Sequence, residues 1–188
     1  MSHSAGVFGI RTAWDFLQKL EGDYADFKKQ PDSARHALNC VMTAYHLHEW
    51  VWLDCLKPDA QRRLQIGLAT KDRIEFRRWL GTNWSNFKTI EELTNGTKHC
   101  GRWDGPMEAN HVSGFGMGPY GVGPYGRSYL VVDLGEEFGQ ERWQPVVTLL
   151  ESAVLFWRTF FQAYALPTHG GSTDNLDGRD PRIQSATL

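Results

Sequence analysis

Apolar side chains near the start of the chain recur at steps of three and four residues, which is the spacing of one helical face. The stripe runs through residues 12–29 and consists of Phe16, Leu20, Tyr24 and Phe27. The pattern predicts a first amphipathic helix with one face in the core.

A second stretch, residues 34–56, is almost wholly apolar until a Lys-Pro pair ends it. Its length of about six turns approaches that of a membrane span, yet His46, His48 and Glu49 lie in its middle. Because ionisable side chains are costly in a bilayer, we interpret the stretch as a buried central helix and expect no membrane association.

Further along the chain the pattern predicts shorter helices over residues 59–68 and 71–80. A longer helix is predicted from Ser85 or Thr89 to about residue 100, because the Thr-x-x-Glu sequence at Thr89 matches a capping box. The final apolar stripe, residues 143–166, predicts a last long helix.

The segment before that last helix changes in composition to Gly, Tyr, Pro and alternating apolar residues. Residues 128–134 are predicted to form a strand, with residues 110–115 as a weaker partner and the Gly-rich sequence GMGPYGVGPYG between them. The expected fold is therefore mainly α: a helical bundle of four long helices plus short helices, with a β-hairpin at about 108–135 inserted before the last helix. One domain is expected over residues 1–166, and the polar segment 167–188 is expected to be disordered.

Composition narrows the class of protein without identifying a function. A chain of 188 residues with a hydrophobic fraction of 41% can bury a self-sufficient core, and eight Trp and ten Phe predict bulky aromatic packing. The net charge of -2 gives no overall attraction to nucleic acid or to an anionic membrane. The three cysteines form no C-x-x-C pair, which argues against disulfides and a zinc ribbon. No signal peptide pattern is found, so a cytoplasmic location is expected.

Candidate chemistry is concentrated on the central helix. Asn39, Thr43, His46 and Glu49 fall on one side of it and form a polar seam. Buried polar groups need hydrogen-bonding partners, so we expect another helix to face the seam and form a polar pocket with it. The segment expected there contains Asn95, Lys98 and His99. One interpretation is a structural network in which Lys98 pairs with Glu49; the other is an acid/base or ligand site in which His46, Glu49, Lys98 and His99 are catalytic and Asn39 and Asn95 bind the ligand.

Other motifs in the chain are weaker. His46-x-His48 does not place both rings on one helical face, and Cys100 beside His99 lacks a third catalytic group, so neither a metal site nor a cofactor site is assigned. The two G-x-G-x-x-G matches of the Gly-rich segment do not open a helix after a strand, which excludes a dinucleotide fingerprint. Tyr120 and Tyr125 in that segment are instead candidate partner-binding residues.

The helix predicted over residues 71–80 is the most basic and aromatic region of the chain. Its Arg77 and Arg78 are candidate residues for binding phosphate or RNA. The alternative interpretation is a helix face that is simply solvated.

The segments SARHALNCVMTAYHLHEWVW and ELTNGTKHC together resemble uncharacterised bacterial helical proteins and, more loosely, the HEPN superfamily of helical bundles. The resemblance covers residues 12–100 and 143–166. It implies a homodimer and an RNase-like or RNA-binding role in bacterial stress or defence, with Asn95 and His99 on the active-site helix. The family's Arg, which is separated from His by four to six intervening residues, is absent: Glu92, Leu93 and Thr94 occupy the corresponding positions ahead of His99.

Three functions follow as expectations. The first is an RNA- or nucleotide-interacting protein of the HEPN type that lacks the catalytic arginine, or a degenerate RNase. The second is a protein-interaction module that uses the GPYG loop and the polar tail, and the third is a small metal-binding enzyme.

Overall fold

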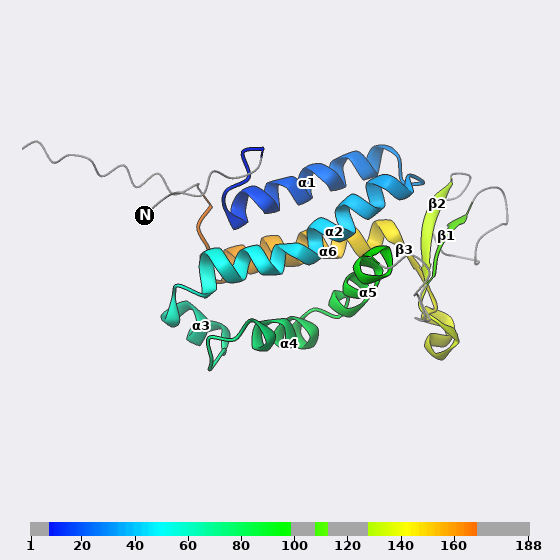
Figure 1. Cartoon of the computed structure of the whole chain (residues 1–188). Helices are drawn as coiled ribbons and strands as arrows, with labels where there is room; N and C mark the ends of the chain where they lie inside the picture. Colours follow the sequence, from blue (N-terminus) through cyan, green and yellow to red (C-terminus); the bar gives the residue numbers. More distant parts are fainter. Residues whose placement is uncertain (1–7, 99–107, 113–127, 169–188) are drawn as a thin grey trace, which may run out of the picture.

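The structure is a computed structural model that describes residues 8–98, 108–112 and 128–168. It confirms a mainly helical fold with an antiparallel hairpin before the last helix (Figure 1). The elements are α1 Ala13–Lys29, α2 Ala34–Val51, η1 Trp52–Leu56, α3 Ala60–Ile66, α4 Arg73–Asn83, α5 Phe87–Lys98, β1 Glu108–Val112, β2 Tyr129–Asp133, η2 Glu136–Glu141, β3 Trp143–Pro145 and α6 Val146–Ala163.

Helix α1 begins with a reciprocal capping box. The Thr12 hydroxyl accepts a hydrogen bond from the Asp15 amide at 3.1 Å, and the Asp15 carboxylate accepts one from the Thr12 amide at 3.0 Å. These contacts satisfy amides that have no partner within the helix. The apolar stripe of α1 then faces α2 and α6, with Leu17, Leu20 and Phe27 fully buried.

The central helix continues beyond α2 as a turn of π-helix, η1. Its wider turn, closed by the Lys57 amide donating to the Trp52 carbonyl at 2.7 Å, ends just before Pro58. The Asp54 carboxylate in this turn accepts a hydrogen bond from the Ala13 amide at 2.8 Å. The end of the central helix therefore caps the start of α1, which fixes the relative position of these two helices.

Two helix starts differ in detail from the prediction. Helix α5 is expected to begin near Ser85 or Thr89 and begins between them, at Phe87, so Thr89 lies inside the helix and the capping box predicted there is wrong. The last helix was expected from residue 143, but Trp143–Pro145 forms β3, which pairs with β2, and α6 begins at Val146. Pro145 at the junction fits both elements, because proline is tolerated at a strand end and immediately before a helix.

The sheet has the order β1-β2-β3 and lies at the end of the molecule where α6 begins (Figure 1). The paired residues of β1 and β2 run from Glu108 with Asp133 to Val112 with Tyr129. Strand β2 is buried along its whole length, which explains why its sequence is apolar at successive positions rather than alternating. Its Asp133 forms a two-point ion pair with Arg142, which closes the loop that contains η2.

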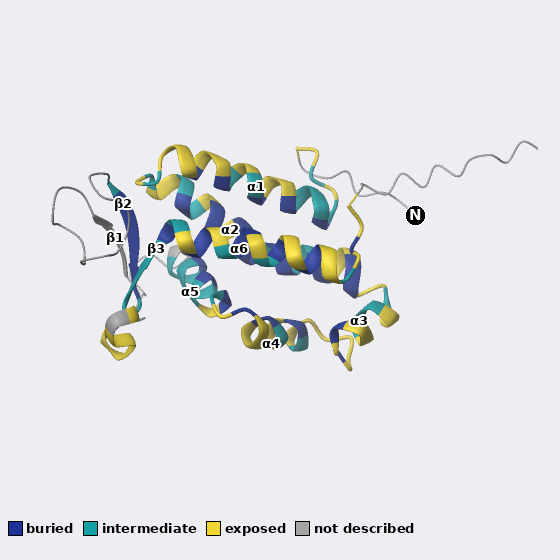
Figure 2. Ribbon diagram, turned by 180° about the vertical axis from the view of Figure 1, so that it is seen from behind, coloured by how far each residue is buried: buried dark blue, intermediate teal, exposed yellow. Residues whose placement is uncertain are grey.

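The core lies where α1, α2 and α6 meet. Buried residues on α1 line the side that faces α2 and α6, and exposed residues line the opposite side (Figure 2). Trp157 of α6 is fully buried, and its indole N–H donates to the Ala44 carbonyl of α2 at 3.0 Å. Arg158 pairs with Glu21 of α1 at the edge of the same interface. Within the described residues, no helix has the length and apolar character needed to cross a membrane.

Candidate functional site

One side of α2 carries a compact polar cluster against α1. Thr43 is buried, and its hydroxyl donates to the Asp23 carboxylate at 2.8 Å. The Lys19 ammonium donates both to Asp23 at 2.5 Å and to the Thr43 hydroxyl at 2.8 Å. The buried Thr43 hydroxyl thus has both a donor and an acceptor beside it, as buried polar groups require.

An open groove of about 220 Å³ lies over this cluster, between α1 and α2. Its lining residues are Phe16, Lys19, Asn39, Met42, Thr43 and His46. The Phe16 ring stacks on Trp50, with ring centroids 5.0 Å apart and an interplanar angle of 16°. The groove therefore combines one supported aromatic ring, apolar side chains and hydrogen-bonding groups.

These positions correct part of the sequence-based pocket. Asn39, Thr43 and His46 were expected to face the helix that contains Asn95, but they line a groove with residues of α1 instead. Alternation of helical faces explains the difference: the α2 side that packs on α5 carries Tyr45 and His48, one position removed from the polar seam.

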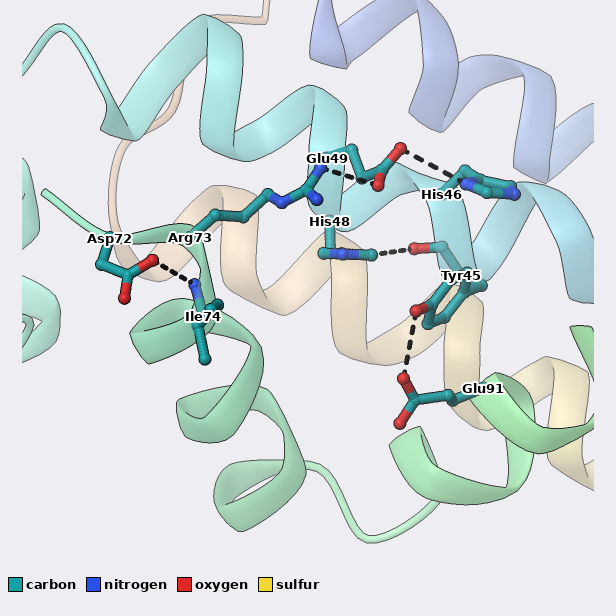
Figure 3. A network of polar contacts seen from close by, with 8 residues as sticks. All are labelled: Tyr45, His46, His48, Glu49, Asp72, Arg73, Ile74 and Glu91. Atoms are coloured by element: carbon teal, nitrogen blue, oxygen red, sulfur yellow. Dashed lines mark hydrogen bonds and ion pairs between the residues drawn. The ribbon is translucent and has the colours of Figure 1, made fainter. Parts of the chain in front are cut away.

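Glu49 connects α2 to the start of α4. Its carboxylate lies 3.5 Å from His46 Nδ1 and accepts a hydrogen bond from Arg73 at 2.8 Å (Figure 3). The side chains of Arg73 and Glu49 are 52% and 36% exposed, so solvent screens the pair and its contribution to stability is small. Within the described residues the partners of Glu49 are Arg73 and His46; the pairing with Lys98, which one interpretation of the sequence predicts, is not tested because that side chain lies outside the described set.

The other side of α2 meets α5 through a tyrosine and a carboxylate. The Tyr45 hydroxyl donates to Glu91 at 3.0 Å, and Arg77 of α4 forms an ion pair with the same carboxylate. Burial, with the nearby Glu91 charge, raises the pKa of Tyr45 to about 12. Tyr45 is therefore a neutral hydrogen-bond donor at physiological pH and not an acid/base group.

His48 is buried in this second face. Its Nδ1 lies 2.5 Å from the Tyr45 carbonyl, so this nitrogen carries the proton and donates it. Its ring meets Phe87 of α5 edge-on. Burial holds the pKa of His48 below its ordinary value despite that hydrogen bond, which favours a neutral imidazole with a structural role.

The remaining sequence-based candidates are distributed as follows. Arg77 and Arg78 are exposed on α4, and Asn95 is half-buried on α5. Lys98 is the last residue of α5, and its side chain lies outside the described set. His99, Tyr120 and Tyr125, with residues 169–188 of the predicted tail, also lie outside the described residues.

The described cysteines have no activated thiol. Burial raises the pKa of Cys40 to about 12 and that of Cys55 to about 12, so both are protonated and unreactive at neutral pH. In the part of the chain that the structure describes, no group of three or more His, Cys, Asp or Glu side chains is placed to hold a metal ion.

The network contains several residues that the sequence did not single out: Lys19, Asp23, Tyr45, Arg73 and Glu91. One signal was available for the first two, because Lys19 and Asp23 are spaced i and i+4 beside the apolar stripe of their helix. Nothing in the sequence pairs Arg73 with Glu49 or Arg77 with Glu91, since those contacts depend on how three helices pack.

The arrangement presents two half-exposed arginines one helical turn apart, each held by a carboxylate from a different helix, with His46 beside the first pair. Such a surface has the donors to bind an anion. Comparison of the chain with protein-family models, with curated proteins and with solved structures finds no match.

Proposed function

We propose that this protein binds phosphate groups of single-stranded RNA, or of a nucleotide, on the surface where α4 meets α2. The observation that supports the proposal is the pair Arg73 and Arg77, spaced i and i+4, whose side chains are 52% and 50% exposed. Their spacing places both guanidinium groups on one side of the helix, and planar guanidinium groups bind phosphate oxygens in a two-point manner.

The carboxylates that hold these arginines leave capacity for a ligand. A guanidinium carries five N–H donors, and the single contact from Arg73 to Glu49 uses one of them. Exposed ion pairs such as Arg73–Glu49 contribute only about 0–1 kcal/mol, so a phosphate can share or displace the Glu49 carboxylate at little cost. The two glutamates therefore orient the arginines in the absence of ligand.

The charge of α4 favours the same ligand. Residues 71–78 contain four basic side chains and two acidic ones, and the acidic ones have local roles. Asp72 caps α4 through the Ile74 amide, and Glu75 accepts hydrogen bonds from the amides of Ala69 and Thr70. Arg78 adds a further exposed cation beside Arg77, so α4 itself carries more basic than acidic side chains, and Glu49 and Glu91 of the neighbouring helices pair with two of the basic ones.

Binding is better supported than catalysis. RNA cleavage by general acid/base chemistry needs a second group beside His46, and the one that the sequence suggests, His99, lies outside the described residues. The HEPN resemblance, a homodimer and a role in bacterial stress or defence accompany this proposal as expectations from the sequence alone.

The test measures binding of a short fluorescein-labelled single-stranded RNA by fluorescence anisotropy across a salt series. The double variant R73Q/R77Q is expected to bind RNA at least about tenfold more weakly than the parent. The slope of log K against log salt concentration should become less negative by roughly one to two. The matched control, K28Q/K29Q, removes two positive charges at the end of α1 and should leave affinity within about twofold. Equal losses in the two variants, or no binding by the parent protein at low salt, would overturn the proposal.

A further inference from the structure

The phosphate surface does not use the groove between α1 and α2, although the two adjoin. His46 lines the groove and lies 3.5 Å from the Glu49 carboxylate, which in turn holds Arg73 at 2.8 Å. One side chain, Glu49, thus separates the rim of the groove from the first arginine. A ligand with a phosphate on Arg73 can extend past His46 into the groove.

The chemistry of the groove suits a flat ring with a hydrogen-bonding edge. Phe16 and Met42 provide apolar contact, and Phe16 is held in place by its stack on Trp50. A supported aromatic side chain of this kind is the usual platform for a nucleobase in single-stranded nucleic acid binding.

The polar lining supplies the edge contacts. The Asn39 side chain, exposed at the groove, offers one donor pair and one acceptor, the combination that pairs with the edge of adenine. Lys19 has three N–H donors; contacts within the described residues use two of them, to Asp23 and Thr43. The third is available for a ring nitrogen or a carbonyl oxygen of a base.

We propose that this groove is a nucleobase-binding subsite, which holds one base of a single-stranded RNA whose phosphates lie on Arg73 and Arg77. The inference rests on the proposed function, because the phosphate surface sets the direction of the strand. It adds a prediction that phosphate binding alone does not make: affinity depends on the base as well as on the backbone.

The experiment compares a fluorescein-labelled oligoadenylate with an abasic ribose-phosphate oligomer of the same length. The parent protein is expected to bind the oligoadenylate about tenfold more tightly, since stacking of one base on an aromatic side chain contributes about 1–3 kcal/mol. The double variant N39A/M42A, which removes the amide and an apolar wall without changing charge, should bind both oligomers with the weaker affinity. The control L155A/Q162A removes the same two kinds of side chain from exposed positions of α6 and should behave like the parent.

The outcomes separate the two proposals. The base subsite is overturned if the parent binds both oligomers with equal affinity, or if N39A/M42A loses affinity equally for both. The phosphate surface stands in either case if R73Q/R77Q still weakens binding. No binding of either oligomer, with no effect of R73Q/R77Q, overturns the phosphate surface and the subsite together. Thermal unfolding of N39A/M42A within a few degrees of the parent establishes that a lost base preference is not a loss of fold.

Discussion

The two sides of helix α2 differ in what they bury. Toward α1 it presents Asn39, Thr43 and His46 around an open groove, and toward α5 and α6 it presents fully buried apolar residues together with the nearly inaccessible His48. The two histidines are only two positions apart, yet the side chain of His46 is 28% exposed and His48 is 2% exposed. Two positions along an α-helix correspond to about 200° of rotation, which places them in opposite environments.

This difference separates a chemical role from a structural one within a single helix. His46 lies beside an exposed carboxylate and an exposed arginine, where solvent and a ligand can reach it. His48 is enclosed by Tyr45 and Phe87 and donates to a backbone carbonyl. Substitutions of buried residues should therefore affect stability, and substitutions of the exposed residues on the groove side should affect binding.

The largest effect is expected from shortening an apolar side chain on the inner side. Leu47 is fully buried, so Leu47→Ala should lower the free energy of unfolding by about 2–5 kcal/mol, through lost transfer energy and the cavity left behind. On the groove side Met42 is 37% exposed, and Met42→Ala should cost at most about 1 kcal/mol. Urea denaturation monitored by tryptophan fluorescence measures both, and similar losses would contradict the assignment of the two sides.

An intermediate effect is expected at the buried hydroxyl beneath the groove. Thr43→Val keeps the branched shape but removes the hydrogen bonds with Asp23 and Lys19, and should cost about 1–2 kcal/mol, because both charged partners lose a contact. Thr82→Val on α4 is the matched control, since Thr82 is exposed and should change stability by less than about 0.5 kcal/mol. If Thr43→Val is as mild as the control, the cluster does not join α1 to α2.

The fold was largely accessible from the sequence because helical periodicity is a local property. The stripe of Phe16, Leu20, Tyr24 and Phe27 repeats every turn, so it predicts a helix whatever the partner. The errors occurred where tertiary contacts decide the boundary. Trp143–Pro145 has the apolar character of the following helix, but pairing with β2 makes it a strand, and the sequence alone does not show that β2 has a second edge to fill.

The candidate site was less accessible, because the sequence shows which side of a helix is polar but not which neighbour that side meets. The sequence shows the seam of Asn39, Thr43 and His46 but not its neighbour: the chemistry of α5 favours that helix, whereas α1 is the helix that packs there. Glu49 was identified without its partner Arg73, which is 24 residues away in the chain. Pairing across helices is set by the packing of the core.

A smaller effect should appear in the pH dependence of stability. Because burial lowers the pKa of His48 in the folded protein, the unfolded chain binds its proton more readily. As the pH falls through the ordinary value of 6.5 toward the lowered folded value, the unfolded state gains protons first, so stability decreases with acidification in that window.

His48→Gln should reduce this slope, and the amide can still donate to the Tyr45 carbonyl. His46→Gln, at the half-exposed position, serves as the matched control and should retain the slope. The measurement is the free energy of unfolding from urea denaturation at several pH values between about 5 and 7.5. If His46→Gln and not His48→Gln removes the slope, the two histidines have been assigned the wrong environments.

The smallest change in stability, and the sharpest contrast between the two sides, is expected from Glu49→Gln. Its ion pair with Arg73 is well exposed on both sides, so removing the charge should cost less than about 1 kcal/mol of stability.

RNA binding should become tighter in the same variant. The carboxylate competes with phosphate for the Arg73 guanidinium, so its neutralisation should tighten RNA binding about two- to fivefold, as expected when a like charge is removed beside an anion. Glu151→Gln on the exposed surface of α6 removes the same charge and controls for the change in net charge. A loss of several kcal/mol in Glu49→Gln, or weaker binding, would make the pair a structural link between α2 and α4 and would remove the main reason to regard the groove side of α2 as the side that binds a ligand.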